Sequence, residues 1–133
     1  MQNSKLIALL CLAAGMAVLA EENPEFVGWM KATKTASDDL KKMEQKTGEQ
    51  AARRAERIGT VYESMIGYWR QRNASDAVKW SEEGKASALM LATAAYSGDA
   101  EKAKTALEAV NNGCKQCHDA HREKIAEGKY RIK

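Results

Sequence analysis

Apolar and small side chains recur at intervals of three and four residues along four segments of the chain. This spacing places them on one face of an α-helix, the face that packs into a core. In chain order the four stripes are Phe26, Met30, Thr33, Ser37, Leu40 and Met43; Ala51, Ala55, Ile58, Tyr62, Met65 and Trp69; Val78, Trp80, Leu89, Ala92 and Tyr96; and Ala103, Leu107, Val110, Cys114 and Cys117. The pattern predicts four helices and no strands.

Residues that start and stop helices separate the four segments. These signals stand at Asn23-Pro24, Thr47-Gly48, Asn73 to Asp76, Ser97-Gly98-Asp99 and Gly128, after which Lys129 to Lys133 form a basic tail. Connections of only a few residues force neighbouring helices to run antiparallel. We therefore expect an all-α fold, an up-down-up-down antiparallel four-helix bundle.

The first twenty residues have the pattern of a secretory signal peptide. Lys5 supplies the positive start, Leu6 to Ala20 is an apolar or small run, and Val18 and Ala20 are the small residues before a cut. The run is shorter than the roughly 20 residues of a membrane span. We expect cleavage after Ala20, a periplasmic domain over residues 21–133, and no stable membrane span after cleavage.

The net charge and the distribution of charged residues limit the kinds of molecule that the protein could bind. Cleavage removes Lys5 as the only charge and leaves 20 Lys and Arg against 18 Asp and Glu, a net charge near +2. Because the two signs are interspersed, this is the solvated surface of a helical protein, and we expect no nucleic-acid binding. Cys11 is lost with the signal peptide, so Cys114 and Cys117 are the two cysteines of the mature chain.

These two cysteines belong to the run Cys114-Lys115-Gln116-Cys117-His118, which reads C-x-x-C-H. This is the attachment signature of a c-type haem. Its two thiols can form thioether bonds with the two vinyl groups, and His118, one helical turn after Cys114, can reach the iron. The motif predicts one covalent haem c, with iron.

Two other chemistries use similar residues. A C-x-x-C pair can be a disulfide redox motif, but a thioredoxin-like motif needs a βαβ pattern that is missing here. Cysteine and histidine also bind zinc, but a closed zinc site usually takes ligands from two segments, and the chain has no second cysteine pair. Both readings are weaker than haem attachment.

No catalytic constellation stands out in the sequence. The acidic pairs Asp38-Asp39 and Glu82-Glu83 are adjacent along their helices. The two side chains of each pair therefore splay apart, which is typical of solvated surface. We expect no enzymatic turnover.

A signal peptide, four helices and C-x-x-C-H on the last helix resemble the class II c-type cytochromes, the cytochrome c-prime family. The resemblance is strongest over Gly98 to Glu101 and from Cys114 to Arg122. It implies that Cys114 and Cys117 carry the thioether links, that His118 is the proximal ligand, and that Arg122 lies beside the haem. His121 departs from the tyrosine that many members have before this arginine, and we expect it near the haem edge, partly exposed.

The resemblance does not decide what lies on the other face of the iron, because the family has two branches that differ there. In one branch a methionine of the first helix fills the sixth site and the protein carries electrons; in the other an apolar side chain blocks that face and gases such as NO can bind. Met30 within Trp29-Met30-Lys31, ten residues before Leu40, resembles the methionine-ligated branch. An early residue of the first helix is level with a late residue of an antiparallel fourth helix, where His118 lies.

The remaining methionines and tryptophans are predicted to pack. Met43 lies toward the wrong end of its helix for ligation, Met65 and Met90 are expected in the core, and the tryptophans are expected in the core or the haem pocket. The function expected is that of an exported monohaem one-electron carrier with His118 and Met30 ligation; the alternative is a five-coordinate, gas-binding cytochrome. Expected partners are redox proteins, small gases in the alternative, and a second copy of the chain, because many relatives pair through their first two helices.

Overall fold

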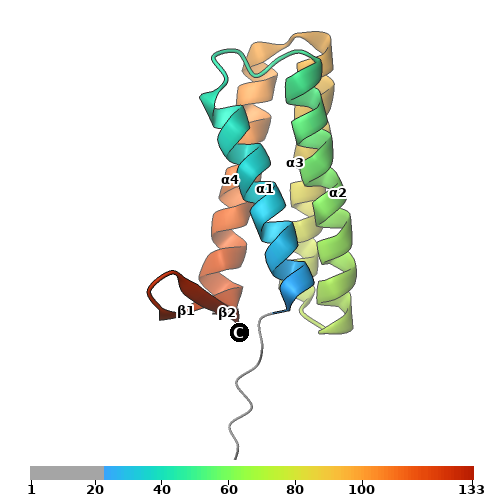
Figure 1. Cartoon of the computed structure of the whole chain (residues 1–133). Coiled ribbons are helices and arrows are strands. Elements are labelled where there is room, and N and C mark those ends of the chain that lie inside the picture. Colours follow the sequence, from blue (N-terminus) through green and yellow to red (C-terminus); the bar gives the residue numbers. More distant parts are fainter. Residues whose placement is uncertain (1–22) are drawn as a thin grey trace, which may run out of the picture.

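Four helices form an antiparallel bundle, followed by a small hairpin (Figure 1). The computed structural model describes residues 23–133, so the predicted signal peptide over residues 1–20 lies outside the described residues. The elements are α1 (Pro24–Lys42), α2 (Glu49–Gln71), α3 (Ser75–Ser97), α4 (Ala100–His121), β1 (Arg122–Ala126) and β2 (Lys129–Ile132). The up-down-up-down arrangement predicted from the short connections is confirmed.

The predicted signals at Asn23, Gly98 and Asp99 start or stop helices, whereas α2 and α3 begin without a side-chain cap. The side chain of Asn23 accepts hydrogen bonds from the amides of Glu25 and Phe26 at 3.0 and 3.2 Å. Asp99 accepts one from the amide of Lys102 at 3.0 Å. Gly98 ends α3 with φ at 76°, in the left-handed region that glycine adopts without strain. The first helix stops at Lys42 and a loop leads to α2, so it is shorter than the Thr47-Gly48 signal indicated.

The centre of the fold is the contact between α2 and α3. Every residue of the predicted α2 stripe is buried, including Met65. The predicted stripe of α3 is partly wrong, because Leu89 and Tyr96 are 51% and 55% exposed, and Met90, expected in the core, is 66% exposed. The buried face of α3 consists mostly of small residues: Ala77, Ser81, Gly84, Ala88, Leu91, Ala92, Ala94 and Ala95. Small side chains let α3 pack closely on α2, whereas Leu89, Met90 and Tyr96 lie on its outer side.

The end of the chain also differs from the prediction. The fourth helix was expected to reach Gly128 and the rest to be a basic tail, but α4 ends at His121 and β1 and β2 form an antiparallel hairpin. Gly128 supplies a positive φ of 67° at the turn. The amide of Lys133 donates a hydrogen bond to the carbonyl of His121 at 3.0 Å, which fixes the chain end against the helix.

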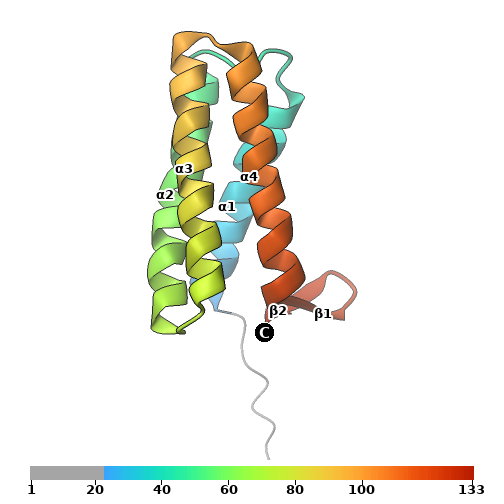
Figure 2. The ribbon, with the colours of Figure 1, turned by 180° about the vertical axis from the view of Figure 1, so that it is seen from behind.

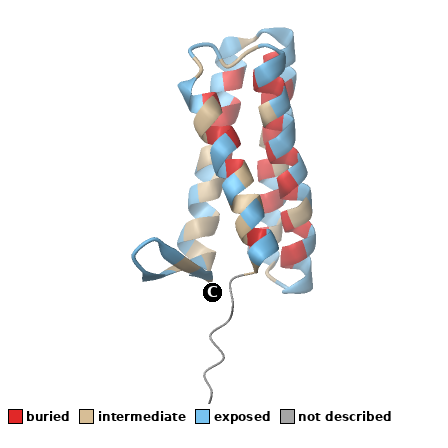
Figure 3. Cartoon of the chain, in the orientation of Figure 1, coloured by how far each residue is buried: buried red, intermediate tan, exposed pale blue. Residues whose placement is uncertain are grey.

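The helix α1 packs mainly on α2 and contacts α4 little. Figures 1 and 2 show that α1 is inclined to α4 and that the two helices lie apart at the end of the bundle that carries the hairpin. Burial follows this separation. The buried residues of α4 all lie in its first half, up to Val110, whereas its second half is intermediate or exposed (Figure 3).

None of the helices within residues 23–133 is both long enough and apolar enough to span a bilayer.

Candidate haem-binding site

A large cavity occupies the space that α1 and α4 leave between them. Its volume is about 1080 Å³. This is slightly above the roughly 300–1,000 Å³ typical of ligand pockets. Its lining comes from all four helices and the hairpin, and it includes Phe26, Met30, Tyr62, Met65, Tyr68, Trp69, Cys114, Cys117, His118 and Arg122. The cavity therefore contains every residue that the sequence predicted for the site.

The three residues of the C-x-x-C-H motif lie on the second half of α4. Cys114, Cys117 and His118 all line the cavity, and each is only half-buried. The two cysteines continue the stripe that is fully buried at Leu107 and Val110. Both are free thiols. The inner face of α4 thus changes from a packed face to an open one where the motif begins.

Burial determines the protonation of two motif side chains. It lowers the pKa of His118, and the nearby Arg122 guanidinium lowers it further. A neutral imidazole is the form that binds metals, so His118 is ready to act as a ligand at neutral pH. Burial, assisted by Cys114 and Asp76, raises the pKa of Cys117 to about 11. Cys117 is therefore a protonated thiol at neutral pH.

A hydrogen bond across the cavity sets the register of α1 against α4. The hydroxyl of Ser37 donates to the side-chain oxygen of Asn111 over 3.0 Å. Met30 lies seven residues before Ser37, and His118 lies seven residues after Asn111. Seven residues are close to two helical turns, so Met30 lies on the same face of α1 as Ser37, and His118 lies on the same face of α4 as Asn111. Because the helices are antiparallel, Met30 and His118 are level with each other.

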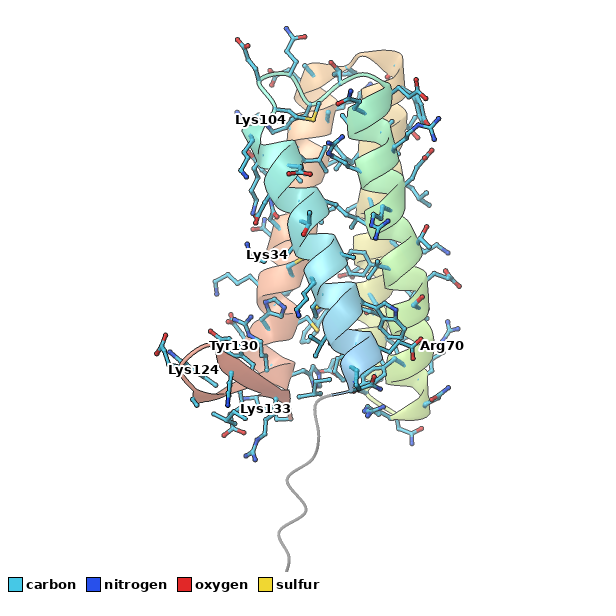
Figure 4. The ribbon with its side chains drawn as sticks, in the orientation of Figure 1. Lys34, Arg70, Lys104, Lys124, Tyr130 and Lys133 are labelled. Atoms are coloured by element: carbon cyan, nitrogen blue, oxygen red, sulfur yellow. The ribbon has the colours of Figure 1, made fainter. Side chains whose placement is uncertain are left out.

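The hairpin closes one end of the cavity. Tyr130 and Ile132 line it from β2, and Ile132 packs against the core. The guanidinium of Arg122 lies 4.2 Å from the centre of the Tyr130 ring, a cation–π contact. Figure 4 shows Lys124, Tyr130 and Lys133 gathered at this end of the bundle, with Lys104 at the other. The resemblance that placed Arg122 beside the cofactor is consistent with its position in the lining.

His121 was expected near a haem edge, and its half-buried ring does line the cavity. Its ring lies 4.8 Å from that of Trp69 and 6.2 Å from that of Trp80. Its two nitrogens are 2.9 Å from a carboxylate oxygen of Asp76 and 3.2 Å from the carbonyl oxygen of Lys133. The histidine therefore joins α4 to the start of α3 and to the end of the hairpin.

Several buried polar atoms support the fit of a large cofactor. The Thr33 hydroxyl, the Tyr68 hydroxyl and the Trp69 indole nitrogen are buried and have no hydrogen-bond partner among the described residues. All three residues line the cavity. Buried polar groups are usually satisfied, so an occupant with polar edges is a reasonable partner for them. Its apolar body would cover Phe26, Met65 and the open half of α4. The cavity thus suits haem in size, lining and motif.

Sequence reasoning treated Tyr62 as a core residue and overlooked Asn111 altogether. The Tyr62 hydroxyl is 3.4 Å from the sulfur of Cys114, and Asn111 makes the only side-chain hydrogen bond between α1 and α4 among the described residues. A signal was present in both cases: each residue carries a polar group where its helix otherwise presents apolar or small side chains. Such a group needs a partner on another element, and the sequence does not say which one.

We also searched the described part of the chain for side chains that could bind a metal ion without haem. Residues 23–133 contain no group of three or more His, Cys, Asp and Glu side chains placed to hold a metal ion.

Comparison with known proteins gives one informative match. No protein-family model and no curated protein sequence matches the chain. Among solved structures, the chain is similar to a cytochrome c′ with an unusual ligand-controlled dimer dissociation, with a TM-score of 0.52 and 26% sequence identity, over 83% of this chain and 88% of that one. The chain thus shares its four-helix bundle with a cytochrome c′, and in this chain a C-x-x-C-H motif opens onto a large cavity.

Proposed function

We propose that this protein is an exported monohaem c-type cytochrome that carries single electrons, with the iron bound by His118 and Met30. The observation that carries the proposal is the register across the cavity. The Ser37–Asn111 hydrogen bond makes Met30 level with His118, and both residues line the same cavity as Cys114 and Cys117.

The four residues have distinct tasks. Cys114 and Cys117 would hold the haem through thioether bonds, each formed by adding the S–H of one thiol across a vinyl C=C bond, with the sulfur on one carbon, the hydrogen on the other and no net oxidation. His118 offers a neutral imidazole nitrogen because burial and Arg122 lower its pKa. Met30 offers a thioether sulfur from the opposite helix. When bound, haem supplies an iron that alternates between the ferrous and ferric states.

A methionine ligand favours electron transfer over gas binding. Thioether sulfur is a soft, neutral donor, and it raises the reduction potential because it stabilises ferrous iron relative to ferric iron. If Met30 remains bound in both states, little rearrangement accompanies electron transfer. We propose an electron carrier and not an enzyme, in keeping with a sequence in which no catalytic constellation stands out. Its partners would be other redox proteins, and its location the periplasm.

A second candidate function is gas binding at a sixth site that is vacant or easily vacated. The observation in its favour is the solved neighbour, a cytochrome c′ whose dimer dissociation is ligand-controlled. Small gases would then be the ligands, and a second copy of the chain would be a partner. The two candidates share the haem, the cysteines and His118, and they differ in what Met30 does.

Mass spectrometry tests what the two candidates share. Protein from a host with haem-attachment machinery should have the mass of the polypeptide plus one haem, and the haem should survive denaturation. Haem that extracts into acidic acetone would contradict the covalent link and both candidate functions with it.

Replacing Met30 separates the candidates. We expect the wild type to be low-spin, and Met30→Ala to be high-spin, lower in reduction potential and open to CO. Met43→Ala is the matched control, because Met43 is also a half-buried methionine of the α1 region that packs against the core. It should retain the wild-type spectrum. A wild type that is already high-spin and binds CO rapidly would favour the gas-binding function, and an unchanged spectrum in Met30→Ala would make Met30 a packing residue.

A further inference from the structure

A tyrosine of α2 lies between a glycine of α3 and the first cysteine of the motif on α4. The ring of Tyr62 is buried at 6% exposure, and its hydroxyl is 3.4 Å from the sulfur of Cys114. Tyr62 and Cys114 both line the cavity. Tyr62 therefore links the helix pair at the centre of the fold to the thiol that the haem would use.

Gly84 leaves room for this arrangement. A Cβ atom built on Gly84 would lie less than 3.0 Å from three carbons at the hydroxyl end of the Tyr62 ring, and real Cβ atoms essentially never come that close. Gly84 is itself buried in α3. A glycine in a helix interior costs stability relative to alanine, and its presence here is explained by the ring that packs on it. The Tyr62 ring is thus supported from behind, with its hydroxyl directed at the sulfur.

Once the thioether has formed, the Tyr62 hydroxyl must be the donor of this hydrogen bond. A thiol can donate or accept, whereas a thioether sulfur has no proton and can only accept. Burial is the main cause that raises the pKa of Tyr62, so the hydroxyl keeps its proton. An O–H···S hydrogen bond draws electron density from the sulfur and, through it, from the macrocycle to which the sulfur is bonded. Hydrogen bonds of this outer kind are one means by which proteins adjust a haem potential.

We propose that Tyr62 is a positioning residue that fixes the Cys114 sulfur through a hydrogen bond, with Gly84 as its support, and thereby raises the reduction potential of the haem. This inference rests on the proposed haem attachment and does not depend on whether Met30 is a ligand. From its place in the buried stripe of α2 alone, Tyr62 would be interpreted only as a packing residue.

The test is the reduction potential of the holoprotein in Tyr62→Phe. This variant keeps the ring on Gly84 and removes only the hydroxyl, so the helix content and the thermal unfolding midpoint should stay close to the wild type while the potential falls. Tyr96→Phe is the control, because Tyr96 is 55% exposed and does not line the cavity. It should leave the potential unchanged.

A glycine pair provides a second test. Gly84→Ala should push the Tyr62 ring from its place and lower the potential in the same direction, whereas Gly67→Ala should have no such effect, because a Cβ at Gly67 meets nothing within 4 Å. The double variant Tyr62→Phe, Gly84→Ala should have the potential of Tyr62→Phe alone, since the hydrogen bond is already lost.

The outcomes are distinct. A wild-type potential in haem-bearing Tyr62→Phe would overturn the positioning role and leave the proposed function intact. Equal shifts in Tyr62→Phe and Tyr96→Phe would also overturn it, because the effect would not depend on the sulfur contact. A wild type without covalent haem would overturn the proposed function and this inference together.

Discussion

At the scale of single residues, the carboxylate of Asp76 connects the start of α3 to the end of α4. It stands in the first turn of α3, accepts a hydrogen bond from the amide of Ala77, and pairs with the Nε2 atom of His121 at the end of α4. The bond from His121 is the largest cause that lowers the pKa of Asp76, followed by the bond from Ala77. Since His121 also contacts the end of the hairpin, this pair holds one wall of the cavity.

The lowered pKa of Asp76 predicts how stability depends on pH. A carboxyl whose pKa is lower in the folded than in the unfolded state stabilises the fold above its unfolded pKa, near 4, and loses this contribution as the pH falls through the folded pKa. In urea unfolding we expect Asp76→Asn to be less stable than the wild type near neutral pH and the difference to disappear at about pH 2. A difference that persists unchanged in acid would show that the ionised carboxylate is not responsible.

The motif residues were predictable at this scale and their surroundings were not. Cys114, Cys117 and His118 lie close together in the chain, so one helix brings them together, and their spacing alone indicates the chemistry. The partners of His121 and Tyr62 lie 45 and 52 positions away. Contacts over such distances depend on how whole helices are oriented, which no local pattern specifies.

At the scale of elements, the orientation of α3 is the clearest test of the packing. Leu91 is fully buried, whereas Leu89, two positions earlier on the same helix, is 51% exposed. Leu91→Ala should lower the free energy of unfolding by about 2–5 kcal/mol through lost burial and a cavity. Leu89→Ala should change it by no more than about 0.5 kcal/mol. Chemical denaturation of both variants checks this, and similar losses at the two positions would contradict the orientation of α3.

How well the sequence predicted the buried face of each helix depended on the size of the side chains that the helix buries. The helices α1, α2 and α4 present large or mixed residues inward, so hydrophobic periodicity predicted their inner faces correctly. The helix α3 buries alanine, glycine and serine and exposes Leu89 and Met90, so a search for large apolar residues selected the wrong side. The hairpin was missed because β2 is four residues long and alternates basic residues with Tyr130 and Ile132, which resembles a charged tail.

At the scale of the whole molecule, the size of the cavity leads us to expect that the bundle depends on the proposed haem for its stability. A protein of this size is stabilised by about 5–15 kcal/mol in total, and a large unfilled space removes packing from several helices at once. The double variant Cys114→Ala, Cys117→Ala should therefore keep helical far-UV circular dichroism but lose its near-UV signal and its cooperative thermal transition. Native-like unfolding of this variant would show that the four helices form a sufficient core without the haem.

The loose contact of α1 with α4 has a consequence for the order in which the molecule opens. The pair α2 and α3 is joined along its length, whereas α1 is held mainly from one side. Segments with fewer buried contacts open at lower free energy and exchange their amide hydrogens sooner. In hydrogen exchange the interior amides of α1 should therefore exchange before those of α2 and α3. The proposed haem would contact both α1 and α4, because residues of both helices line the cavity. Preventing haem attachment should therefore accelerate exchange most in α1, and uniform acceleration over all four helices would contradict this order.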